Sequence, residues 1–94
     1  DVRESPALDV WHLLSRLGAE VGYHDPYVPT YYFEGKSHKS VPLDSKVLRK
    51  TDCGILLANH KTLDISHIYD NCMNIIDTRN AFKGYPAREG LQTL

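Results

Sequence analysis

The apolar positions near the start of the chain predict an amphipathic helix. Four of them recur with the i, i+3, i+4, i+7 spacing of a single helix face: Val10, Leu13, Leu14 and Leu17. Ser5-Pro6 is a typical helix start. The Ser side chain can accept a hydrogen bond from an unpaired backbone N–H, and Pro at the first helical position has no N–H that needs a partner. Gly18 stands where a left-handed C-terminal cap is expected.

Three short segments have the pattern of strands. Residues 19–24 form the first, which ends at Asp25-Pro26 because Pro has no N–H for a ladder bond. Residues 54–58 are a continuous apolar run, typical of a parallel strand covered on both faces. Residues 74–77 carry two adjacent isoleucines and predict the third strand.

Two further helices are expected between these strands. One covers about residues 44–50, with Leu43 and Val47 facing inward and Leu48 as a further candidate, and the other starts at Asp64 as its N-cap. Residues 26–42 have no sustained period and predict a loop, whose aromatic residues suggest that it packs down. Residues 81–94 form a weakly patterned tail.

Helix and strand alternate three times in this reading. Such an order implies a parallel sheet with right-handed crossovers, that is, an open α/β sheet in one domain of residues 1–94. Ligands bind such sheets beyond the carboxyl ends of the strands, which selects residues 24–26, 59–60 and 78–80. Arg79 is the most suggestive side chain there, because its planar fork can bind a phosphate; the alternative is a solvated surface arginine.

Composition excludes several classes of partner. The 94 residues are 41% hydrophobic and carry a formal net charge of −1, without the basic stripe that nucleic-acid binding requires. No apolar run approaches the roughly 18 residues of a membrane span, and no signal peptide precedes Asp1, so we expect a cytoplasmic protein. Cys53 and Cys72 are expected to be reduced, with a packing role for Cys53.

Several residues have both a functional and a structural interpretation. His24 could be a general base, but a hydrogen-bonded structural histidine is favoured. Trp11, off the main apolar face, is expected to pack or to form an interface. Tyr31, Tyr32 and Phe33 favour local packing over an oligomer contact. A zinc site is not expected, because none of the possible ligands forms the usual close pairs: Cys53, His60, His67 and Cys72.

Three segments in order resemble one enzyme family. They are Asp-Val-Arg-Glu-Ser-Pro-Ala-Leu at residues 1–8, Tyr-His-Asp-Pro-Tyr-Val-Pro at residues 23–29 and Asp-Thr-Arg-Asn at residues 77–80. Their sequence and spacing resemble the UDP-glucose/GDP-mannose dehydrogenase family, and within it the UDP-N-acetylglucosamine and UDP-N-acetylmannosamine 6-dehydrogenases.

The resemblance implies a C-terminal, UDP-sugar-binding domain with a three-layer Rossmann-like fold. Family members oxidise the C6 alcohol of a UDP-sugar to a carboxylate, with NAD bound mainly by an N-terminal domain and with a catalytic cysteine. By this resemblance Arg79 contacts the UDP part of the substrate and Arg3 reaches the NAD pyrophosphate. The implied partners are the UDP-sugar, the N-terminal and central domains of the same enzyme, and further copies in a homo-oligomer.

Two departures from the family pattern limit the expected function. The family's first strand, of the type G-x-A-[FY]-K, would precede residue 1, so we expect a sheet that lacks it and a fragment that is marginally stable or self-associates. Neither Cys53 nor Cys72 has the sequence context of the family's nucleophile. We therefore expect no catalytic residue and no activity in the chain alone; the alternative is a non-catalytic nucleotide-binding or oligomerisation module.

Overall fold

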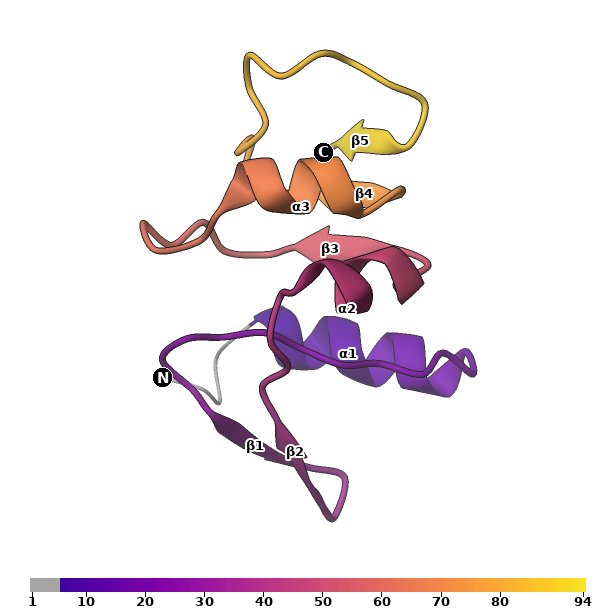
Figure 1. Cartoon of the computed structure of the whole chain (residues 1–94). Helices are drawn as coiled ribbons and strands as arrows, with labels where there is room; N and C mark the ends of the chain where they lie inside the picture. The colour runs from indigo at the N-terminus through magenta and orange to yellow at the C-terminus, as the bar shows by residue number, and fades with distance from the viewer. Residues whose placement is uncertain (1–5) are drawn as a thin grey trace. The chain divides into compact units, whose positions relative to one another are not determined.

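The computed structural model describes residues 6–94 and divides the chain into two compact units. The first unit ends at Pro42, and the second comprises Leu43–Leu94. The elements follow in the order α1, β1, β2, α2, β3, α3, β4, β5 (Figure 1). Arg3 and the predicted cap Ser5 lie outside the described residues.

The first unit begins with the predicted helix, but a different face of it is buried. α1 covers Pro6–Arg16, and Gly18 follows it with a φ of 90°, as expected for a left-handed cap. Trp11 is buried, whereas Leu13 and Leu17 are 59% and 83% exposed. Val10 and Leu14 of the predicted stripe are half-buried, so the stripe is covered only in part, while an aromatic cluster packs on the Trp11 side of the helix.

An antiparallel hairpin occupies much of the segment that was expected to be a loop. β1, Thr30–Phe33, pairs with β2, Lys36–Lys39. Glu34 and Gly35 connect them with φ values of 52° and 77°, the pattern of a two-residue type I′ turn whose twist suits a hairpin. The loop prediction for residues 26–42 is wrong over this stretch.

The predicted strand at residues 19–24 does not form. Its Tyr23 packs on Trp11 with ring centroids 5.5 Å apart, and the Tyr23 hydroxyl donates to the Val28 carbonyl oxygen at 2.9 Å. The Val41 N–H donates to the Tyr23 carbonyl oxygen at 2.8 Å. Aromatic packing and single loop contacts take the place of a ladder in this segment.

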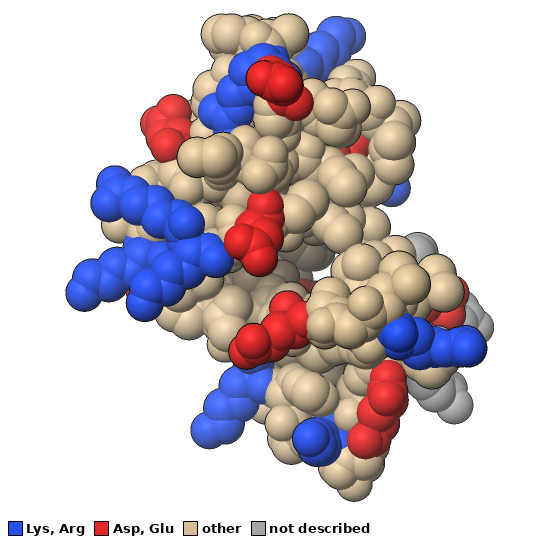
Figure 2. Space-filling model, turned by 90° about the vertical axis from the view of Figure 1, so that its right-hand side faces the viewer, with Lys and Arg blue, Asp and Glu red and all other residues tan. Residues whose placement is uncertain are grey.

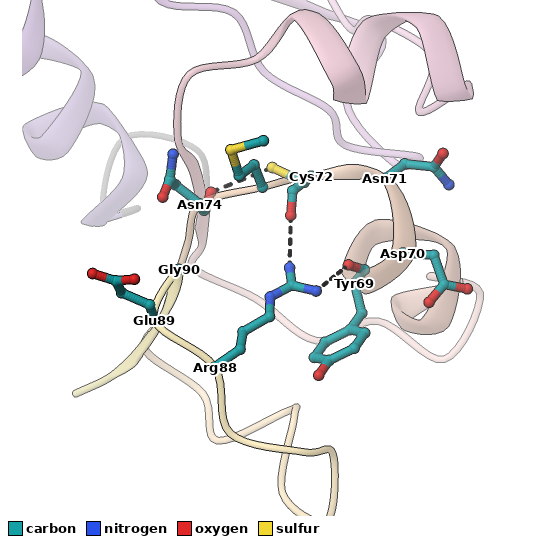
Figure 3. A pocket seen from close by; sticks show the side chains of 9 residues that line it. Tyr69, Asp70, Asn71, Cys72, Asn74, Arg88, Glu89 and Gly90 are labelled. Carbon is teal, nitrogen blue, oxygen red and sulfur yellow. Dashed lines mark hydrogen bonds between the residues drawn. The ribbon is translucent and has the colours of Figure 1, made fainter.

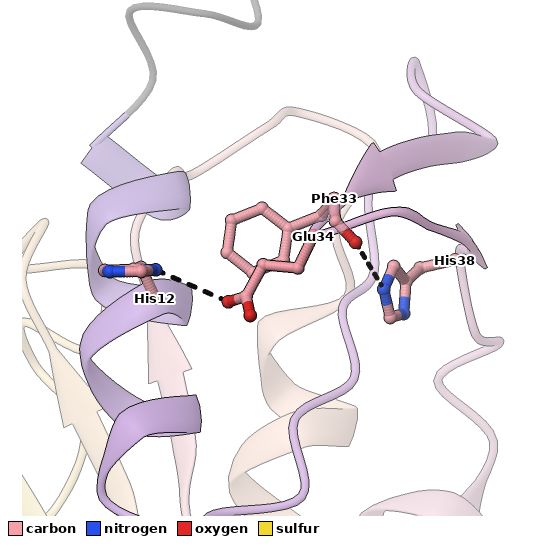
Figure 4. A network of polar contacts seen from close by, with 4 residues as sticks. All are labelled: His12, Phe33, Glu34 and His38. Atoms are coloured by element: carbon pink, nitrogen blue, oxygen red, sulfur yellow. Dashed lines mark hydrogen bonds and ion pairs between the residues drawn. The ribbon is translucent and has the colours of Figure 1, made fainter.

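Aromatic side chains form the interior of the first unit. Tyr31, Phe33 and His38 surround Trp11 with ring centroids 6.2, 5.1 and 4.8 Å from it. His12 of α1 lies 3.4 Å from a carboxylate oxygen of Glu34, and His38 Nε2 lies 3.3 Å from the Phe33 carbonyl oxygen (Figure 4). Local packing of Tyr31 and Phe33 is confirmed, whereas Tyr32 is exposed.

The helices of the second unit start where the sequence predicts. α2 covers Ser45–Lys50 and α3 covers Ile65–Asn71, and the two pack against each other. Asp44 Oδ1 accepts the Val47 N–H at 2.9 Å, and Asp64 Oδ1 accepts the His67 N–H at 3.1 Å. Both carboxylates thus satisfy N–H groups that the first helical turn leaves unpaired.

A three-stranded parallel sheet forms the other layer of the second unit. β3, Gly54–Leu56, and β4, Ile75–Asp77, confirm the two later strands of the prediction, and β5, Leu91–Thr93, is added from the expected tail. The order is β3-β4-β5 (Figure 1). This sheet with its helices confirms the α/β, Rossmann-like class.

The core of the second unit lies between these helices and the sheet. Ile75 of β4 is buried against the helices, and β4 alternates buried, half-buried, buried along its three residues. The fully or nearly buried residues of this core come from both layers and the loop after β4: Leu48, Ile68, Cys72, Ile75 and Phe82. Among residues 6–94 no helix has the length and apolarity needed to cross a bilayer.

Candidate ligand-binding loop at the carboxyl end of β4

The loop that follows β4 folds around a buried carboxylate. Asp77, the last residue of β4, has 0% exposure. Its Oδ1 accepts the Arg79 N–H at 2.9 Å, and its Oδ2 accepts the Phe82 N–H at 3.0 Å. One side chain therefore fixes both ends of a turn. The sequence had predicted that a strand ends here, but not this turn.

The ionised form of Asp77 is the stable one. Burial acts to raise the pKa of Asp77, but the backbone N–H groups of Phe82, Arg79, Ala81 and Asn80 outweigh it and hold the pKa below the ordinary value. Because the folded-state pKa is the lower one, the carboxylate stabilises the fold above the ordinary pKa of an aspartate, and this stabilisation is lost as the pH falls.

Further bonds connect the loop to both neighbouring strands. Thr78 donates twice to the Leu56 carbonyl oxygen of β3, from its N–H at 3.2 Å and from its hydroxyl at 2.7 Å. The Leu94 N–H donates to the Asp77 carbonyl oxygen at 3.0 Å. Asn80 takes a left-handed conformation, with a φ of 55°, which asparagine tolerates better than most residues.

Arg79 projects from this fixed backbone. Its side chain is exposed, and its guanidinium makes no hydrogen bond or ion pair with residues 6–94. The residue follows the carboxyl end of β4, in neither a helix nor a strand. This is the position that the sequence predicted; the role of Arg79 in binding stays a prediction.

The second predicted place lies at the same end of the sheet. Residues 57–60 follow β3, which runs parallel to β4, so Asn59 and His60 leave the sheet on the same edge as Arg79. Asn59 is exposed and His60 is half-buried. The His60 carbonyl oxygen accepts the Leu63 N–H at 3.0 Å.

The third predicted place is not a strand end, because residues 19–24 form no strand. His24 Nδ1 lies 2.8 Å from the Val41 carbonyl oxygen, and Asp25 Oδ1 accepts the Tyr27 N–H at 2.8 Å. Both side chains hold the loop backbone of the first unit, which favours the structural interpretation of His24.

The packing role expected of Cys53 is wrong. Both cysteines are free thiols, but it is Cys72 that packs in the core, whereas Cys53 is exposed. Neighbouring atoms still remove part of the water around its sulfur, and this desolvation, with a smaller effect of Cys72, raises the pKa of the Cys53 thiol, which keeps it protonated near neutrality. Among residues 6–94, no group of three or more His, Cys, Asp or Glu side chains could hold a metal ion.

An open cavity of about 600 Å³ lies near the amino ends of β4 and β5 and was not predicted (Figure 3). Arg88 crosses it and donates to the carbonyl oxygens of Tyr69, in the last turn of α3, at 2.8 Å and of Cys72, the residue that follows α3, at 2.7 Å. Its guanidinium also lies 4.1 Å from the centre of the Tyr69 ring. We interpret Arg88 as a helix C-cap, because these donors serve carbonyls that the helix leaves unpaired. The weak pattern of residues 81–94 gave no signal for this role.

Charged side chains of both signs lie on the surface of the described residues. The face shown in Figure 2 carries acidic side chains between its basic ones. The last turn of α2 carries Arg49 and Lys50, but the formal net charge of the chain is −1. That nucleic acid is not a partner stays a prediction from the sequence.

Open parallel α/β sheets bind ligands, nucleotides among them, beyond the carboxyl ends of their strands, which is where Arg79 lies. The family model of the UDP-glucose/GDP-mannose dehydrogenase family, UDP binding domain, matches residues 1–84. The chain therefore belongs to this family. The match includes the Arg79 loop and ends before β5. No curated protein and no solved structure matches the chain.

Proposed function

We propose that this chain is the UDP-binding part of an NAD-dependent nucleotide-sugar 6-dehydrogenase. The enzyme oxidises the C6 alcohol of a UDP-hexose or UDP-N-acetylhexosamine to the uronic acid, and Arg79 contacts the diphosphate of the substrate. The observation that carries this proposal is the exposed guanidinium of Arg79 on a backbone fixed by Asp77, at the carboxyl end of a parallel strand in a chain of this family.

The chemistry of Arg79 suits a diphosphate. A guanidinium presents parallel N–H donors that match two phosphate oxygens, and a charge-assisted bond of this kind contributes about 1.5 to 3 kcal/mol. No bond to residues 6–94 must be broken before the ligand binds. The loop backbone is already ordered, so binding orders only the side chain.

The chain binds and orients in this proposal and does not react. Cys72 is buried, and the raised pKa of Cys53 disfavours the thiolate that a nucleophile needs. The six glycines provide no G-x-G-x-x-G fingerprint, so residues 6–94 do not fit a dinucleotide cradle. NAD is then held mainly by an N-terminal domain of the same enzyme, with Arg3 as a contact to its pyrophosphate.

Titration of the chain with UDP tests the role of Arg79. Arg79→Ala is expected to raise the Kd by about 10- to 150-fold, the loss of one charge-assisted contact. Arg49→Ala, which removes an exposed arginine from α2, is the matched control and should leave the Kd unchanged. In the whole enzyme Arg79→Ala should raise the KM for the UDP-sugar with less effect on kcat. An unchanged Kd and KM would refute the assignment.

The substrate and the assembly belong to the same proposal. We favour UDP-N-acetylglucosamine or UDP-N-acetylmannosamine as substrate, on the resemblance of residues 1–8, 23–29 and 77–80, within a cytoplasmic homo-oligomer. Oxidation rates of the whole enzyme with these two sugars and with UDP-glucose distinguish the choices. A clear preference for UDP-glucose would overturn the acetamido-sugar assignment.

A non-catalytic oligomerisation module is the second candidate. The observation in its favour is the exposure of Leu13 and Leu17, because adjacent exposed leucines on one helix favour a protein contact. A chain that self-associates but binds no UDP in the same titration would support this candidate over the first.

A further inference from the structure

Asp77 stands next to the proposed ligand contact but cannot itself touch a ligand. Its carboxylate is fully buried, and it points back into the loop, toward the N–H groups of Arg79 and Phe82. An arginine on a free loop would sample many positions, and each would lower the fraction of chains ready to bind. The bonds to Asp77 remove that freedom at the backbone of Arg79.

We propose that Asp77 is the positioning residue for Arg79, and that it makes this loop recognise its anionic ligand through the guanidinium and not through the backbone amides. The inference rests on the proposed function and extends it. Successive backbone N–H groups in a turn of this kind form a concavity that binds anions. Here the concavity already contains an anion, the carboxylate of the chain itself.

The contacts of the loop support this division of roles. The Arg79 and Phe82 N–H groups are both used by Asp77, at 2.9 and 3.0 Å, and the Thr78 N–H is used by Leu56 at 3.2 Å. A ligand phosphate therefore finds these three amides occupied. What the loop offers instead is the side chain of residue 79, which is exposed.

A carboxylate is the group that this geometry requires. Both oxygens accept, one from each end of the turn, and an amide could serve only one of them, because its NH₂ would face the other N–H donor. Asp77→Asn keeps the size of the side chain and removes one of the two anchors. Either the Arg79 end or the Phe82 end of the turn is then released, and in both cases the arginine is held less firmly.

A double-mutant cycle on UDP binding tests the inference. Asp77→Asn is expected to raise the Kd of the chain for UDP by at least about threefold when Arg79 is present, and by less than about twofold in the Arg79→Ala background. Asp70→Asn, an exposed aspartate of α3, is the matched control and should have no effect in either background. Circular dichroism on every variant checks that helix content is retained.

Each outcome of the cycle has a distinct meaning. An equal loss in both backgrounds, or no loss in either, would overturn the positioning role while Arg79 keeps its assignment. No effect of Arg79→Ala alone would instead refute the proposed function, and the positioning role would fall with it.

Amide hydrogen exchange on the unmodified chain provides a second measurement if Asp77→Asn does not fold. The Arg79 and Phe82 amides should exchange at least about tenfold more slowly than unprotected amides, despite their place in a loop. Exchange at the unprotected rate would overturn the inference.

Discussion

Substitution of Gly90 by alanine is expected to detach β5 from the sheet. A Cβ at this position would lie 2.1 Å from the Met73 carbonyl oxygen, far inside van der Waals contact, and the obstacle is backbone. The Gly90 carbonyl oxygen also accepts the Ile75 N–H at 2.7 Å, so residue 90 cannot move away without breaking a bond to β4. The whole β4–β5 pairing is only three residues long.

The cost follows from the contacts that β5 makes. Losing the two bonds that flank the β4–β5 ladder, from Ile75 to Gly90 and from Leu94 to Asp77, costs about 1 to 3 kcal/mol at the usual net value of a hydrogen bond, and the bonds of the ladder itself add to this. Exposing half-buried Leu91 adds about 1 kcal/mol. The sum, at least about 2 to 4 kcal/mol, is a large part of the about 5 to 15 kcal/mol that stabilises a typical domain.

Urea unfolding followed by circular dichroism measures this change. Gly22→Ala is the matched control, because its added Cβ meets nothing within 4 Å and its φ is not positive. We expect Gly22→Ala to be neutral or to stabilise by about 0.4 to 1 kcal/mol through the unfolded chain. If Gly90→Ala lowers the free energy of unfolding by less than about 1 kcal/mol, the close approach to Met73 does not constrain the fold.

Two further predictions concern charged side chains of the second unit. Arg88→Met should lower the free energy of unfolding by about 2 kcal/mol, because it removes both donors to the end of α3. The control Arg49→Met should change the free energy of unfolding by less than about 0.5 kcal/mol in the same urea experiment. Equal effects of the two substitutions would contradict the capping role. Stability should decline as the pH falls below about 4, where the unfolded chain takes up the Asp77 proton first, and Asp77→Asn should flatten this part of the stability curve against pH. A curve of the same slope in both proteins would show that other groups cause the decline.

Local rules predicted the elements whose signals are local. Asp44 and Asp64 each precede a helix and accept an N–H of its first turn, and the helices start where these residues predict. The adjacent isoleucines of β4 and the position of Arg79 just beyond it followed from the same reasoning. These features depend on a few neighbouring residues, and at these positions tertiary packing agrees with the local preference of the sequence.

The missed elements depend on contacts that are distant in sequence. β5 forms because Gly90 allows the chain to approach Met73, and nothing within residues 91–93 indicates that contact. Apolar and polar residues alternate along residues 19–24 as in a strand, but Tyr23 packs on Trp11 in the aromatic cluster and the segment pairs with no strand. The hairpin turn differs from both, because Glu34-Gly35 is not one of the usual Asn-Gly or Asp-Gly pairs and only its glycine indicated a turn.

The candidate site was predicted in part. Residue type and place in the strand order were sufficient to select Arg79, since both can be read along the sequence. The role of Asp77 could not be read in this way, because it depends on complete burial and on the return of the chain to Phe82.

The loop after β4 is held in place through the main-chain N–H of residue 79, whereas the side chain of residue 79 is exposed and supports no part of the fold. Shape and chemical selectivity are therefore separable at this position: the turn should tolerate almost any residue there. A designer, or natural variation, can exchange the recognition group at residue 79 and alter the choice of ligand while the surrounding architecture stays intact.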